Sequence, residues 1–301
     1  MMNPVVKGYL RLARPANLPT AAADIFAGAA ISGYFVNVPL DGLWDSSRLS
    51  VLLLLVFASI FIYAAGVVLN DVFDHKLDKI ERPERPIPSG LIPLRSAAIF
   101  GGILLNIGVL LAFMVNQMSG IIAFVLGIFI LLYDAVAKHH GIFGPLTMGI
   151  CRGLNLLMGI TLLGSLDNWW YLVLPIVYIA AITLISRGEV HGDNKSHIIF
   201  SGSLYASVIL GLVLLFLTSD RNLLEALPFL LLFSFFVFKP LIGAYKDNSP
   251  NNIKKAVKAG VIAIILLDAA MAVGFSHWWV GLVTLLLLPL SIYLSKLFAV
   301  T

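Results

Sequence analysis

Three aspartates are spaced so that they can act together on one ligand. Asp71, Asp74 and Asp78 follow an apolar stretch at spacings of three and four residues, so a helix would carry them on one face. Three carboxylates on one stripe repel each other unless a cation neutralises them. Mg²⁺ suits such a stripe, because it takes a few carboxylate ligands and also accepts phosphate oxygens. The other interpretation is a solvated acidic helix end at a membrane surface.

Basic residues follow this acidic stripe directly. Arg82 and Arg85 each precede a proline, which favours an extended or turned backbone rather than a helix. Forked guanidinium groups on a stiff loop beside carboxylates would make a clamp for phosphate groups. Alternatively, both arginines bind lipid headgroups or only add to the positive charge of the loop.

A second acidic pair, Glu189 and Asp193, lies four residues apart, so one helical turn would aim both carboxylates the same way. Gly188 and Gly192 would let the backbone bend or approach a ligand closely. We expect the two acidic clusters to face each other and to hold metal ions that bridge a diphosphate. His191 is either a further ligand or a surface histidine.

The elements that must position these residues are membrane helices. Hydrophobic residues make up 59% of the chain, charged residues 12%, and the mean hydropathy is +0.96. A soluble protein has about 25% charged residues. The single cysteine, Cys151, excludes an internal disulfide, and the basic residues lie between apolar runs without a nucleic-acid-binding motif. We therefore predict an integral membrane protein in the lipid bilayer that binds no nucleic acid.

A membrane helix needs about 20 mostly apolar residues. Ten segments of residues 1–301 meet this criterion, and nine spans remain possible if the last two segments merge with a re-entrant piece. We predict one all-α domain, a multi-pass bundle of nine or ten transmembrane helices around a central cavity. The segments are 16–36, 50–70, 96–115, 119–137, 142–165, 169–187, 198–218, 223–244, 257–275 and 278–298.

The distribution of basic residues predicts the orientation. With the N-terminus in the cytoplasm, the cytoplasmic segments hold 17 of the 20 lysines and arginines. The loops on the other side hold only Arg48 and Arg221. Both acidic clusters would then lie on the cytoplasmic side.

The motifs resemble those of the UbiA superfamily of intramembrane prenyltransferases. Asn70, Asp71, Asp74 and Asp78, followed by the run from Arg85 to Gly90, match the first signature of that superfamily. Further, weaker markers are Arg14 with Pro15, Tyr133 with Lys138, and the acidic pair. The second signature usually carries an aspartate where this chain has Glu189, which suggests a divergent member.

The resemblance implies an enzyme that transfers an isoprenyl group from an isoprenyl diphosphate to a lipophilic acceptor, with Mg²⁺ as cofactor. The resemblance favours an aromatic or ring-bearing acceptor. Tyr133 would face the cavity near the reacting carbon. The implied metal ligands are Asn70, Asp71, Asp74 and Asp78 at the first ion and Glu189 and Asp193 at the second. The implied diphosphate ligands are Arg82, Arg85, Lys138 and Arg187.

Three ionisable residues, Asp24, Arg152 and Asp268, fall inside predicted spans, where such groups usually face a cavity or a partner. Arg152 either binds the acceptor or diphosphate, or forms an ion pair with Asp24 or Asp268. Two other functions remain open from the sequence. The chain could be a non-catalytic relative that binds or moves a lipid-like metabolite, or an ion-coupled transporter.

Overall fold

The structure is a computed structural model that describes residues 3–36, 46–219 and 221–298. These residues form helices and turns and no strand. The N-terminal half contains α1 (Pro4–Ala13), η1 (Pro15–Asn17), α2 (Leu18–Ile31), α3 (Ser46–Phe73), α4 (His75–Glu81), α5 (Leu94–Val115), α6 (Gln117–Ala135) and η3 (Ala137–His139). The rest contains α7 (Phe143–Ile160), η4 (Thr161–Leu163), η5 (Trp169–Leu172), α8 (Val173–Ser186), α9 (Lys195–Thr218), α10 (Leu223–Lys246), α11 (Pro250–Phe275), α12 (Trp278–Leu285) and α13 (Leu287–Leu297).

Nine segments of the described chain are long and apolar enough to cross a membrane. They correspond to the second to tenth predicted segments, and the last two stay separate. The α-helix within the first predicted segment, 16–36, is the 14-residue α2, which is shorter than a bilayer needs. The prediction of an all-helical, multi-pass membrane bundle is confirmed.

Small residues explain why α2 lies inside the bundle. It packs against α3, α7, α11 and α13. A Cβ atom added at Gly28 would lie 2.5 Å from the Leu156 carbonyl oxygen and 2.7 Å from the Gly159 Cα of α7. The two helices can approach this closely only because neither Gly28 nor Gly159 carries a side chain.

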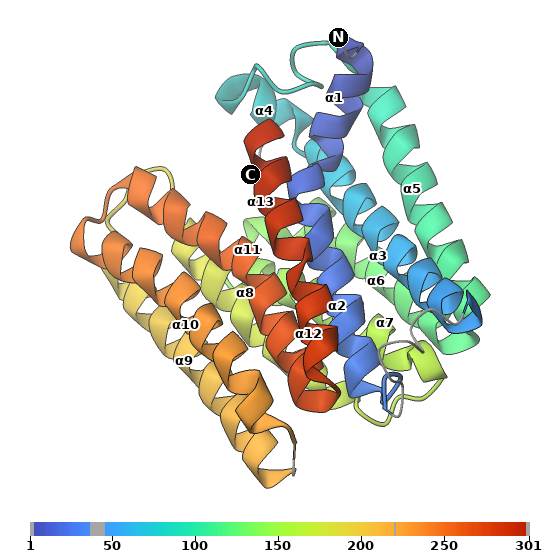
Figure 1. Cartoon of the computed structure of the whole chain (residues 1–301). Coiled ribbons are helices and arrows are strands. Elements are labelled where there is room, and N and C mark those ends of the chain that lie inside the picture. Colours follow the sequence, from blue (N-terminus) through green and yellow to red (C-terminus); the bar gives the residue numbers. More distant parts are fainter. Residues whose placement is uncertain (1–2, 37–45, 220, 299–301) are drawn as a thin grey trace.

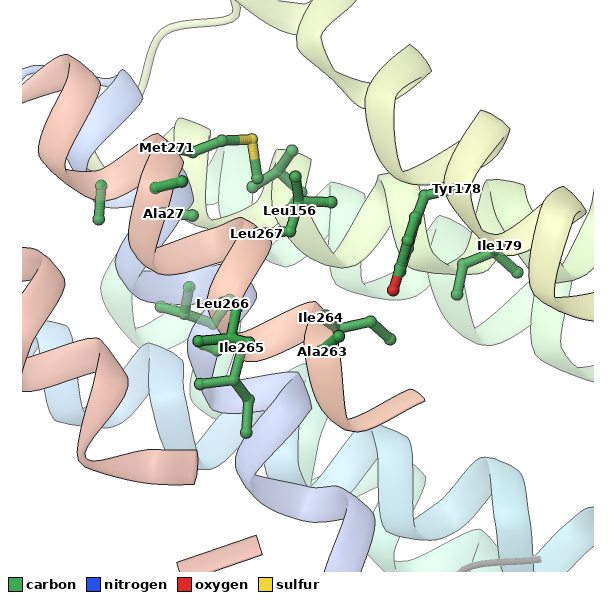
Figure 2. Close-up of a cluster of buried hydrophobic side chains, with 14 of the residues drawn as sticks. Ala27, Leu156, Tyr178, Ile179, Ala263, Ile264, Ile265, Leu266, Leu267 and Met271 are labelled. Atoms are coloured by element: carbon green, nitrogen blue, oxygen red, sulfur yellow. The ribbon is translucent and has the colours of Figure 1, made fainter. Parts of the chain in front are cut away.

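Large apolar side chains fill the bundle where α2, α7, α8 and α11 meet. Figure 2 shows this cluster, with Leu156 of α7, Tyr178 of α8 and Leu267 of α11 among its members. The α11 helix is the most buried of the nine spans. Side chains fill this part of the bundle. The open cavity predicted at the centre of the bundle stays a prediction.

The connections that carry the predicted motifs lie at one end of the bundle. In Figure 1 the N-terminus, α4 and the connection between α10 and α11 all lie toward the upper side. Both acidic motifs belong to this end, because each follows a helix that runs toward it. Which side of the membrane this end faces stays a prediction.

Candidate active site

The first acidic motif lies where α3 ends and α4 begins. The Asp74 N–H donates to the Asn70 carbonyl at 2.9 Å, and the Asp78 N–H donates to the Asp74 carbonyl at 2.9 Å. Helical hydrogen bonding therefore continues across the break between α3 and α4. Asp71 and Asp78 are buried, and Asp74 is half-buried. The aspartates occupy the shared helix face that their spacing predicts.

Two arginines neutralise the buried aspartates of this motif. Arg14 lies 2.8 Å from Asp71, and Arg85 lies 3.1 Å from Asp71 and 2.8 Å from Asp78. Arg85 thus bridges two carboxylates with one guanidinium. Charge-assisted hydrogen bonds of this kind are stronger than neutral ones, so they fix the loop against the helix.

The loop that carries Arg85 is held by its own turns and by apolar contacts. The Ser89 N–H donates to the Arg85 carbonyl at 3.0 Å, and the Ile92 N–H donates to the Pro86 carbonyl at 2.9 Å. Ile87 and Ile92 are buried in a small core with α1, α3 and α5. These anchors hold Arg85 against the aspartates, and the backbone of the loop is turned, as its prolines predict.

The end of α6 and the η3 turn that follows it supply further groups to the same cluster. Lys138 forms an ion pair with Asp74, with Nζ 2.5 Å from Oδ1. The Asn70 side-chain amide donates to Asp134 at 2.8 Å. Tyr133 is half-buried and close enough to Asp74 and Arg14 to interact electrostatically. Tyr133 and Lys138 therefore lie at the first acidic motif, while their chemical roles stay predictions.

The second acidic motif lies in the turn between α8 and α9. The helical turn predicted across it is incomplete, because Gly192 and Asp193 have left-handed φ angles of 73° and 52°. Glu189 is half-buried, whereas Asp193 and His191 are exposed. The same turn is fastened to the α10–α11 connection, since the Asn194 N–H donates to Asn248 Oδ1 at 2.8 Å.

Glu189 of the second acidic motif interacts electrostatically with a residue that follows the first acidic motif. Burial raises the pKa of Glu189 above its ordinary value, and the nearby positive charges of Lys254 and Arg82 partly offset this rise. Arg82 belongs to the loop after the first motif, so its charge reaches the second. Within the part of the chain that the structure describes, no three His, Cys, Asp or Glu side chains are close enough to hold a metal ion. Metal binding by the two acidic sets stays a prediction.

The other predicted phosphate ligands have different surroundings. Arg82 is exposed, and exposed Arg187 donates a hydrogen bond to the Gly141 carbonyl. Arg152 is buried between spans, where it lies 2.7 Å from Asp24 and 3.9 Å from Asp268. The ion-pair interpretation of Arg152 is therefore the one that the contacts support. A role for Arg152 at the diphosphate stays a prediction.

Two residues of the cluster were not among our candidate site residues. From the sequence, Arg14 is only part of a weak marker, and Asp134 has no assigned role. The signal for Arg14 was its place before Pro15 and the first apolar segment. The signal for Asp134 was a carboxylate at a span end, four residues before Lys138.

Comparison with known proteins identifies the family. A family profile described as the UbiA prenyltransferase family matches residues 26–257. The chain belongs to this family. A similar protein is the digeranylgeranylglyceryl phosphate synthase of Methanococcoides burtonii, which is 38% identical over 160 residues. That match covers 51% of this chain and 54% of the relative, so the chain spans about half the length of that relative.

Solved structures of UbiA homologues share the fold. The apo homologue from Aeropyrum pernix has a TM-score of 0.69 at 15% identity, covering 85% of this chain and 97% of that one. The homologue from Archaeoglobus fulgidus bound to GPP and Mg²⁺ has a TM-score of 0.63 at 16% identity, covering 88% and 99% of the two chains. These similarities support the bundle architecture over the 85–88% of the chain that the two matches cover.

Proposed function

We propose that this protein transfers an isoprenyl group from an isoprenyl diphosphate to an acceptor in the membrane. The observation that carries the proposal is the pairing of three aspartates with three cations at one helix end. Asp71, Asp74 and Asp78 are bound by the side chains of Arg14, Arg85 and Lys138. Such a cluster can exchange its internal ion pairs for the opposite charges of a metal–diphosphate complex.

The donor set of this cluster fits Mg²⁺. Carboxylate and amide oxygens are the hard ligands that Mg²⁺ prefers, and the first motif offers both. Asn70, Asp71, Asp74 and Asp78 would hold one ion, and Glu189 and Asp193 would hold a second. When bound, the ion stabilises the charge on the leaving diphosphate. A UbiA homologue described as bound to GPP and Mg²⁺ supports this assignment.

The basic residues would bind the phosphate oxygens and orient the diphosphate. Arg85 and Lys138 face the aspartates, and Arg14 reaches the cluster from the end of α1. Fixed cations favour departure of the diphosphate, because they are already aimed at the oxygens that gain charge. Arg82 and Arg187 lie on the loops beside the cluster and would contribute at its rim.

A glyceryl phosphate lipid is the acceptor that the relatives favour. Their name, digeranylgeranylglyceryl phosphate synthase, describes a product with a glyceryl phosphate and no aromatic ring. We therefore replace the aromatic or ring-bearing acceptor expected from the sequence by a glyceryl phosphate lipid with a free hydroxyl group. The lipid bilayer would supply this acceptor and the isoprenyl diphosphate alike.

A second function is favoured by one observation. The acidic side chains pair with basic ones, and Asp193 is exposed behind a left-handed turn. A protein that binds or moves a lipid-like metabolite without catalysis would need the basic cluster and no second metal site. Such a protein would bind the lipid-like metabolite without converting it.

Purified protein separates the two functions. Labelled geranylgeranyl diphosphate with Mg²⁺ should bind and release diphosphate when a glyceryl phosphate lipid is added. Asp71→Ala and Asp74→Ala should each abolish this release, whereas Asp247→Ala, at the end of α10, should leave it unchanged. Undiminished release in both site variants would overturn the proposal. Tight binding without product from any glyceryl phosphate or aromatic acceptor would favour the non-catalytic function.

A further inference from the structure

Asp134 is a buried carboxylate that neither the motif spacing nor the family resemblance explains. It lies near the end of α6 with 3% of its surface exposed. Its Oδ1 accepts a hydrogen bond from the Asn70 amide at 2.8 Å. Among the described residues its Oδ2 has no hydrogen-bond partner, although that atom is buried. Burying such a group is costly, so its position at the acidic motif calls for a function.

The chemistry of this hydrogen bond fixes the orientation of Asn70. A carboxylate only accepts hydrogen bonds, so Asn70 must turn its NH₂ group toward Asp134. The carbonyl oxygen of the Asn70 side chain then points away from Asp134. Asn70 lies one helical turn before Asp74, and the Asp74 N–H donates to the Asn70 backbone carbonyl at 2.9 Å. Both side chains therefore project on one face of the helix.

Lys138 interacts with both carboxylates. Its ammonium group contacts Asp74 at 2.5 Å and interacts electrostatically with Asp134. The group of Asp74, Asp134, Asn70 and Lys138 thus ties the end of α3 to the end of α6. Asp134 accepts the hydrogen bond of the Asn70 amide and interacts electrostatically with the Lys138 ammonium group.

We propose that Asp134 is a positioning residue of the metal–diphosphate site, which presents the Asn70 carbonyl oxygen to the cation beside Asp74. This inference rests on the proposed function. Ligands to a metal ion commonly depend on such partners, because a second hydrogen bond fixes their rotamer before the metal arrives. Asp134 is not itself assigned as a ligand.

The test measures Mn²⁺ binding to the purified, full-length protein by electron paramagnetic resonance, without turnover. Asp134→Leu removes the acceptor and should weaken Mn²⁺ binding about tenfold or more. Asp134→Asn retains an acceptor oxygen and should recover much of that loss. The matched control is Asp247→Leu, since Asp247 also accepts a hydrogen bond from an asparagine amide, Asn252, at 2.7 Å. This control should bind Mn²⁺ as the parent protein does.

A double-mutant cycle shows whether Asp134 acts through Asn70, and Asp134→Asn keeps the test meaningful if Asp134→Leu is unstable. Asn70→Ala should weaken Mn²⁺ binding by itself, and adding Asp134→Leu should then have little further effect. Additive effects, or unchanged binding in Asp134→Leu, would overturn this inference alone. A parent protein that binds neither Mn²⁺ nor geranylgeranyl diphosphate would overturn the proposed function as well.

Discussion

Glu189 differs from the other acidic residues at the site because burial dominates its surroundings. Burial raises the pKa of its carboxyl group, and the charges of Lys254 and Arg82 offset only part of the rise. An acid whose pKa rises on folding favours the unfolded state once pH exceeds its unfolded value of about 4.3. Without divalent cations, ionised Glu189 should therefore cost stability that protonated Glu189 does not.

The variant Glu189→Gln tests this residue without requiring catalysis. In the presence of a chelator of divalent cations, the variant should melt at the same temperature as the parent at about pH 3, where both side chains are neutral. At about pH 8 it should melt at a higher temperature, because glutamine carries no charge to bury. Thermal unfolding in detergent measures both values. A variant that is less stable than the parent at about pH 8 would contradict the burial argument.

Single residues also show where prediction from the sequence ends. The spacing of Asp71, Asp74 and Asp78 specifies a shared helix face, because helical geometry is local. The partners of these residues are not local: Arg14 lies 57 positions from Asp71, and Asp134 lies 64 positions from Asn70. Such pairs depend on how helices pack, and no spacing rule within one helix contains that information.

The long membrane spans could be predicted from hydropathy. The places where the backbone bends were harder to predict. Apolar runs identified the nine long spans because lipid demands about 20 apolar residues. The segment 16–36 is mostly apolar as well, yet α2 ends at Ile31. The turn at Gly192 and Asp193 is predictable only in part: Gly192 indicates a bend, whereas the i, i+4 acidic pattern suggests a helical turn that the left-handed residues interrupt.

At the scale of the helices, Arg152 connects three of them inside the bundle. It sits on α7 and joins Asp24 of α2 to Asp268 of α11, and it donates a hydrogen bond to the Thr20 hydroxyl at 3.1 Å. The two carboxyl groups share one guanidinium. Removing that guanidinium would leave both buried acids without their cation.

Arg152→Leu should therefore destabilise the protein by about 3–5 kcal/mol. Asp24→Asn, which leaves Asp268 to pair with the arginine, should cost less. Unfolding in detergent with increasing denaturant measures both losses. If Arg152 instead binds the diphosphate, Arg152→Leu would raise the KM for isoprenyl diphosphate while the stability stayed near that of the parent.

At the scale of the whole molecule, the motif-bearing end must face one side of the membrane. Lysine and arginine concentrate at this end, in the segments around Lys79, Lys138, Lys195 and Lys254. The positive-inside tendency of membrane proteins places such segments in the cytoplasm. A cytoplasmic site would also meet an isoprenyl diphosphate, which is too polar to cross the bilayer unaided.

Cysteine labelling of intact cells tests this orientation. Cys151→Ala removes the single cysteine of the chain, and Lys79→Cys or Asp167→Cys then provides a thiol at an exposed position of opposite ends. An impermeant thiol reagent should label Asp167→Cys in intact cells and Lys79→Cys only after lysis, because the α4 segment lies inside. Cys151→Ala alone should remain unlabelled in both states. Labelling of Lys79→Cys in intact cells would place the acidic motifs on the outer side, where a cytoplasmic isoprenyl diphosphate cannot reach them.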